Sequence, residues 1–161
     1  MGAKTLKPAA ASLYDEDFAV WTAETARLLR AGRFDEVDIE HVAEEIEDMG
    51  KRDKRELHSR LTVLILHLLK WKWQPEKQTQ GWQATLLTQR AELDRLLEDS
   101  PSLRRATAAA VARVYPAVLE TVALETGLPA TAFPSECPFS PDQILARSST
   151  SNRPAEIPAF A

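Results

Sequence analysis

Apolar positions along this chain recur every three to four residues, and no stretch shows the apolar–polar alternation of a half-buried β-strand. The pattern predicts an all-α fold, a single-domain helical bundle of about five main helices followed by a short C-terminal helix. These helices are expected near residues 12–31, 35–49, 54–73, 76–99, 101–126 and 140–147. Gly and Pro residues separate most of them, as is typical of helix ends.

The segment 57–73 is apolar on almost every side, whereas the other predicted helices each have one apolar face. A helix of this kind must be surrounded by other helices, so the helix near 54–73 is predicted to be the buried centre of the bundle. The preceding helix has a narrower stripe, which is predicted to be its packing face. This stripe consists of Ile39, Val42, Ile46 and Met49.

The sequence leaves open whether the second helix ends at Gly50 or continues through it. An interior glycine costs about 1 kcal/mol relative to alanine, and Asp53 with Glu56 has the spacing of a capping box for a new helix. Continuity is favoured by two acid-first i,i+4 pairs, Glu47–Lys51 and Asp48–Arg52. The stripe also stays in phase with the apolar face of the next helix. We expect a kink or a short break at Gly50.

The composition is that of an ordinary globular protein, with 44% hydrophobic and 27% charged residues in 161. A net charge of −4 gives poor support to a general nucleic-acid or membrane-surface binder, which is usually basic. Cys137 is the single cysteine, so an intrachain disulfide and a cysteine zinc cluster are both excluded. A reducing, cytoplasmic location is therefore expected.

The longest apolar run, residues 61–69, is far shorter than the roughly 20 residues that span a bilayer, so no membrane segment is expected. Residues 1–11 are predicted to be a flexible N-terminal lead. Residues 12–147 are predicted to form the helical bundle domain. The remaining residues, 148–161, contain Ser, Asn and Pro and are predicted to be a disordered tail.

Several short motifs occur in an order that resembles a known family. They are Tyr14-Asp15-Glu16-Asp17-Phe18 with Trp21, residues 28–34, 44–47 and 67–71, Gln74-Pro75-Glu76 with Trp82, and residues 100–103, 125–129 and 133–138. This succession resembles the family catalogued as domain of unknown function 29, an all-helical bacterial family without an assigned activity. The resemblance covers residues 14–145 and implies the fold. Because the family has no established active site, it assigns no functional residue.

No pattern in the chain predicts a catalytic or metal site. Asp38-x-x-His41 has the spacing of a carboxylate–histidine metal site in helix bundles, but His41 falls opposite the stripe and is expected to face solvent. His58 and His67 point in opposite directions on one helix and cannot share a ligand. A nucleophile elbow and a Gly-rich phosphate loop are both missing. We predict no catalytic residue, no metal and no cofactor, and a hydrolytic or metal-dependent enzyme is the least favoured function.

Cys137 lies between Pro134 and Pro138 in a loop punctuated by prolines. We interpret it as a small apolar side chain that anchors this loop against the bundle. A reactive thiol is the alternative, and the rate of alkylation distinguishes the two.

Aromatic and basic side chains alternate over residues 67–90, and a single-stranded nucleic-acid groove uses such residues for stacking and for phosphate contacts. The candidate binding residues are His67, Lys70, Trp71, Trp73, Gln74, Trp82 and Arg90. The alternative is that the tryptophans pack a corner between two helices while the lysines extend into water.

The function favoured by the sequence is a non-catalytic helical interaction module that binds a protein partner or a second copy of itself. Two observations favour it: the chain has no catalytic pattern, and it carries an acidic segment and a basic segment that are separated along the chain. Complementary charges of this kind set the register of protein pairs. Binding of nucleic acid is the alternative function, and no membrane partner is expected.

Overall fold

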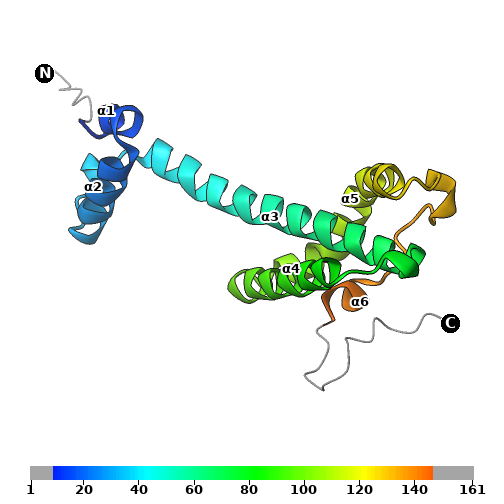
Figure 1. Ribbon diagram of the computed structural model, residues 1–161. Coiled ribbons are helices and arrows are strands. Elements are labelled where there is room, and N and C mark those ends of the chain that lie inside the picture. The colour runs from blue at the N-terminus through cyan, green and yellow to red at the C-terminus, as the bar shows by residue number, and fades with distance from the viewer. Residues whose placement is uncertain (1–8, 147–161) are drawn as a thin grey trace, which may run out of the picture. The chain divides into compact units, whose positions relative to one another are not determined.

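The computed structural model describes residues 9–146, and every regular element in this range is a helix (Figure 1). The α-helices are α1 (Ala9–Glu16), α2 (Phe18–Arg30), α3 (Ile39–Trp73), α4 (Gln80–Asp99), α5 (Leu103–Thr126) and α6 (Pro141–Leu145). Three short 3₁₀ turns, Phe34–Glu36, Pro75–Lys77 and Ala130–Ala132, connect them. The all-α prediction is confirmed. The predicted tail, and the predicted lead up to residue 8, lie outside the described residues.

The chain divides into two compact units, Met1–Lys51 and Arg52–Ala161. We call them the N-terminal unit and the C-terminal unit and describe each by itself. The first part of α3 belongs to the N-terminal unit and the rest to the C-terminal unit. The extent of a single bundle domain over residues 12–147 stays a prediction.

Helix α3 is unbroken through Gly50, so the break expected there is wrong. Gly50 has a negative φ, unlike Gly32 and Gly127, and its backbone is helical. The Lys51 ammonium donates to Asp48 Oδ1 at 2.9 Å across this position. This pair is three residues apart, in place of the four-residue spacing of the two predicted pairs, and it joins the acidic and basic sides of Gly50.

The N-terminal unit begins with two helices where the sequence predicted one. Asp17 separates them, because its Oδ1 accepts a hydrogen bond from the Val20 backbone N–H at 3.0 Å and so caps α2. Helix α1 begins at Ala9, within the predicted lead. After α2, Gly32 adopts a φ of 70°, the left-handed conformation that favours glycine at a helix end.

The C-terminal unit is built around the second half of α3. Between Leu57 and Trp73, only Ser59 and Lys72 are exposed, which confirms the prediction of a buried central helix. Side chains from α4, α5, α6 and the loop between α5 and α6 complete one apolar core around it. These include Leu86, Leu93, Leu97, Val111, Tyr115, Val118, Val122, Phe133, Phe139 and Ile144.

The ends of α4, α5 and α6 follow local capping chemistry. Helix α4 begins four residues later than predicted, because Thr79 accepts from the Trp82 N–H and the 3₁₀ turn Pro75–Lys77 precedes it. Helix α5 ends at Gly127 in the left-handed conformation, as predicted. Ser140 and Gln143 form a reciprocal capping box at the start of α6.

Helix α5 is long and apolar enough to cross a membrane, judged by length and composition alone. In the structure it supplies fully buried side chains such as Val118 and Val122 to the core. It therefore behaves as a core helix of the C-terminal unit.

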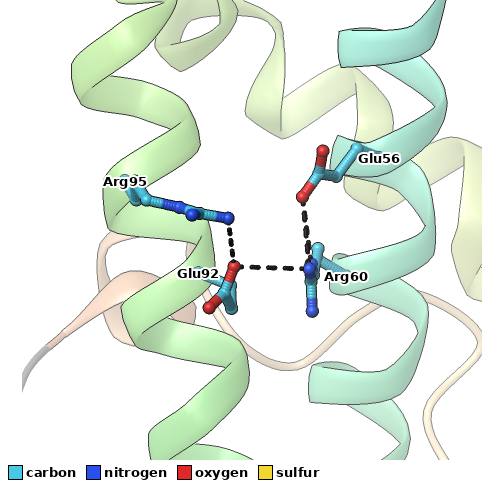
Figure 2. Close-up of polar contacts among 4 residues, drawn as sticks. All are labelled: Glu56, Arg60, Glu92 and Arg95. Carbon is cyan, nitrogen blue, oxygen red and sulfur yellow. Dashed lines mark hydrogen bonds and ion pairs between the residues drawn. The ribbon is translucent and has the colours of Figure 1, made fainter.

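A chain of charged side chains ties α3 to α4 at the edge of this core (Figure 2). The Arg60 guanidinium donates to Glu56 one turn before it and also contacts Glu92 of α4 at 3.4 Å. Glu92 accepts in turn from Arg95 at 2.6 Å. Because these groups are partly solvated, the network fixes how α3 and α4 align more than it adds stability.

Replacing Leu64 by Ala tests the buried centre. Leu64 is fully buried in the core, so Leu64→Ala is expected to lower the free energy of unfolding by about 2–5 kcal/mol in urea titrations. The matched control is Leu124→Ala, since the Leu124 side chain is 84% exposed and is expected to change stability by less than about 0.5 kcal/mol. Equal losses from the two variants would contradict the assignment of the core.

Candidate interaction surface

In the N-terminal unit, Tyr14 of α1 covers a polar face of α3. The Tyr14 ring stacks on the His41 ring, with centroids 3.9 Å apart, and the Tyr14 hydroxyl donates to Glu45 Oε1 at 2.7 Å. This bond and burial raise the pKa of Tyr14 to about 12. Phe18 and Trp21 pack edge-on against the same tyrosine. The contact between the helices is thus aromatic on one side and largely polar on the other.

Asp38 and His41 form a pair at the start of α3. The Asp38 carboxylate lies 2.6 Å from His41 Nδ1, and its other oxygen accepts from the His41 backbone N–H. Hydrogen bonding to Asp38 raises the pKa of His41, and the same bond lowers the pKa of Asp38. The expectation that His41 faces solvent is wrong, because Tyr14 covers its ring. In the part of the chain described, no group of three His, Cys, Asp or Glu side chains could hold a metal ion.

The apolar stripe of α3 lies about a quarter turn away from this covered polar face. Its members Ile39, Ile46 and Met49 are 56%, 63% and 60% exposed, and Val42 is half-buried. The prediction that this stripe packs inward is therefore wrong. Within the described residues, the side of the helix that is covered is the one that forms hydrogen bonds, whereas the stripe is left to water. We call these four residues the α3 stripe.

Other exposed apolar groups lie in the same unit, notably Phe34 at 61% and, to a smaller extent, Phe18 and Val20. Single exposed apolar side chains are normal on a protein surface. A row of them along one helix face, beside small residues, is typical of a surface that binds another protein. Ala43 and Gly50 are the small residues here, and both are exposed beside the stripe.

The charge along α3 changes sign at Gly50. Exposed acids precede it (Glu40, Glu44 and Glu47) and exposed bases follow it (Lys51, Arg52, Lys54 and Arg55). The helix therefore carries exposed charges of opposite sign on the two sides of Gly50. Both segments lie at the surface, where they can act on an approaching partner.

The candidate binding residues in segment 67–90 all lie in the C-terminal unit, but two of them are buried. Gln74 donates through Nε2 to the Thr126 carbonyl at 3.1 Å, which ties the end of α3 to the end of α5. Arg90 donates to the carbonyls of Ile144 and Gln143 at 3.0 and 3.2 Å and so holds α6. Burial lowers the pKa of Arg90. Neither side chain is placed to meet a phosphate or a base.

The other five candidates are partly buried and make internal contacts. Trp73 Nε1 donates to the Ala132 carbonyl, and His67 Nδ1 lies 2.9 Å from the Val63 carbonyl. Lys70 Nζ lies over the Trp82 ring at 4.6 Å and also pairs with Glu125 at 2.8 Å. Trp71 packs against the core. Trp73 packs on Phe133 in the loop after α5 rather than in the corner between α3 and α4. Lys70 does not extend into water, because it pairs with Glu125, so the structural alternative given above holds only in part.

A cavity of about 490 Å³ lies between α5 and the loop before α6. Val111, Tyr115 and Pro116 of α5 line one side, and Glu136, Cys137 and Phe139 line the other. Cys137 is partly buried against the core, and this burial raises the pKa of its thiol.

Comparison with protein families gives one match. The model of the family described as Domain of unknown function DUF29 matches residues 13–149. The chain belongs to this family. No curated protein and no solved structure matches the chain.

Sequence reasoning missed Tyr14 as the residue that selects which face of α3 is covered. Its partners His41 and Glu45 are 27 and 31 positions away in the chain, so no local spacing could reveal them. The tyrosine within the acidic motif 14–18 is the one signal that the sequence offered.

The pairing of Asp38 with His41 predicts a pH dependence. Because the folded-state pKa of His41 is raised, the stabilisation from this pair is complete below the unfolded pKa near 6.5 and is lost as pH rises through the folded value. Asp38→Asn is expected to lower the pKa of His41 in an NMR titration. Glu24→Gln serves as the control, because Glu24 pairs with Arg27 instead. An unchanged His41 titration in Asp38→Asn would contradict the pairing.

The burial of Cys137 predicts a slow reaction with thiol reagents. Its raised pKa leaves little thiolate at neutral pH, and the α5–loop packing restricts access. Alkylation of native protein by iodoacetamide is expected to be at least roughly tenfold slower than alkylation of the urea-unfolded chain, monitored by mass spectrometry. Equal rates would support the reactive-thiol alternative.

Proposed function

We propose that this protein is a non-catalytic helical interaction module that binds another protein through the α3 stripe. The observation that carries the proposal is the exposure of Ile39, Ile46 and Met49 on a helix whose polar face is covered. An apolar row of this kind loses contact with water when a second helix lies on it, and burial stabilises the pair by about 25 cal/mol per Å² of apolar surface before the costs of association.

The charge distribution supports the same proposal. Exposed acids and bases on either side of Gly50 give the helix two ends of opposite sign, and a partner with the complementary pattern is oriented as it approaches. The candidate residues of segment 67–90 do not add a second function, because Gln74 and Arg90 are buried and Lys70 already has two partners. A nucleic-acid partner stays the less favoured hypothesis.

A cytoplasmic location in a bacterial cell is part of the proposal. It rests on the single cysteine, which suits a reducing compartment, and on the bacterial character of the family that the chain resembles.

Site-specific photo-crosslinking tests whether the α3 stripe contacts a protein. A photoreactive amino acid at position 46 is expected to yield a covalent protein adduct in cells that produce the full chain. The same residue at position 124 is the matched control, because Leu124 is an exposed apolar side chain outside the stripe. Adding Met49→Asp to the position-46 variant is expected to remove most of the adduct, since it puts a charge into the stripe.

The proposal is overturned if position 46 gives no adduct, or no more than position 124 does. It is also overturned if the adduct survives Met49→Asp at full yield, because contact would then not depend on the apolar row. Circular dichroism of each variant checks that the helices are retained.

A further inference from the structure

The spacing of the α3 stripe indicates the shape of the surface that covers it. Its members are separated by three, four and three residues, which is the a/d spacing of a coiled-coil seam. A row this narrow fits one facing helix rather than a sheet. At 1.5 Å per residue the row extends over about 15 Å, or roughly three helical turns. The whole stripe belongs to the N-terminal unit, so this surface is complete within one compact unit.

A row of acids lies beside the stripe on the exposed side of α3. At 100° per residue, Glu40 and Glu47 come next around the helix after the small residues that flank the stripe, and Glu44 follows them. All three are exposed, and none of their carboxylates takes part in a hydrogen bond or a close ion pair within residues 9–146. Asp48, by contrast, pairs with Lys51 at 2.9 Å. The three exposed carboxylates are therefore available to the cations of a partner.

Only small residues separate the stripe from these acids. Ala43 and Gly50 lie between the two rows around the helix, and both are exposed. A Cβ placed on Gly50 would meet no atom within 4 Å beyond its own helix backbone and chain neighbours, so the surface there is open. A lysine or arginine from a helix on the stripe can lay its apolar stem across these small residues. Its cationic head then reaches the carboxylate of Glu40 or Glu47.

The N-terminal unit as a whole carries the same sign of charge as this row. Residues 1–51 contain twelve Asp and Glu against six Lys and Arg, whereas residues 52–161 contain twelve against fourteen. Long-range attraction therefore favours a partner surface rich in cations. Nucleic acid, an anionic membrane surface and a second copy of the same unit would each bring negative charge to these acids.

From the apolar row, the small residues and the acids together, we infer that the α3 stripe binds a cationic amphipathic helix of another protein. This helix has apolar residues three and four positions apart, and Lys or Arg along the edge that faces Glu40 and Glu47. The inference rests on the proposed function and names the chemistry of the partner. Apolar contact supplies an attraction that salt does not screen, and the charges select a basic partner.

Two synthetic helical peptides test this chemistry. Both have leucine at the a and d positions, and they differ only in carrying lysine or glutamate along one edge of that row. Fluorescence polarisation with the full chain is expected to detect binding of the lysine peptide and little binding of the glutamate peptide. Binding of the lysine peptide is expected to weaken severalfold when salt is raised from about 0.05 to about 0.5 M. Equal binding of the two peptides, or no binding of the lysine peptide at low salt, overturns the inference.

Matched variants of the full chain test whether the acids beside the stripe are the ones used. Glu40→Gln combined with Glu47→Gln is expected to weaken binding of the lysine peptide severalfold. Glu98→Gln combined with Glu120→Gln removes two exposed acids of the C-terminal unit and is expected to leave binding unchanged. Equal weakening by the two pairs would show general attraction to an acidic protein and overturns the inference.

A second pair of variants tests the apolar contact. Ile46→Ala is expected to weaken binding of the lysine peptide severalfold, because it removes apolar surface from the stripe. Leu124→Ala, the matched change on α5, is expected to leave binding unchanged, since Leu124 is exposed outside the stripe. Circular dichroism checks that both variants keep their helices. Full binding by Ile46→Ala overturns the inference, because the contact would then be electrostatic alone.

The photo-adduct at position 46 separates this inference from the proposed function. Mass spectrometry of the digested adduct is expected to place the crosslink in a partner segment with Lys or Arg beside an apolar row of helical spacing. A crosslink to an acidic segment, or to a second copy of this chain, overturns the inference while the proposed function stands. The absence of any adduct removes both.

Discussion

The structure of the C-terminal unit depends on the need to enclose a helix segment that is apolar on almost every side. From Leu57 to Leu69, α3 exposes only Ser59 to water, and its leucines and Ile65 are buried. Helices α4 and α5, with the loop that follows α5, pack around this segment and bury it. The polar contacts that remain, such as Arg60 with Glu92 and Gln74 with the Thr126 carbonyl, align the surrounding elements. They do not provide the main driving force.

The first half of the same helix obeys a different constraint. Its covered face consists of groups that need hydrogen-bond partners, and Tyr14 provides one for Glu45 and stacks on His41. A buried carboxylate or imidazole without such a partner would cost more than leaving an isoleucine in water. The small N-terminal unit has few residues with which to cover α3, and it covers the face whose burial brings specific bonds. The apolar stripe is what remains available for another molecule.

This contrast explains how far the sequence could predict the structure. The fold class, the buried segment 57–73, the Gly32 and Gly127 helix ends and the Ser140 cap all follow from local periodicity and capping chemistry. The fate of the stripe does not, because periodicity identifies a face that favours burial but not the chain segment that covers it. Arg90 illustrates the same difficulty for the candidate site. A guanidinium that holds two carbonyls inside the protein and one that binds phosphate look alike in a sequence.

The hydrogen bonds from Arg90 to α6 also affect how firmly α6 stays packed on the core. A helix of five residues has too few backbone hydrogen bonds to persist in water by itself. The buried Arg90 guanidinium holds α6 in place, because it donates hydrogen bonds to the carbonyls of Gln143 and Ile144 in that helix. Detaching α6 would uncover Ile144 and leave an interior cation without acceptors. The last helical turn and the core of the C-terminal unit are therefore expected to come apart together, as one cooperative element.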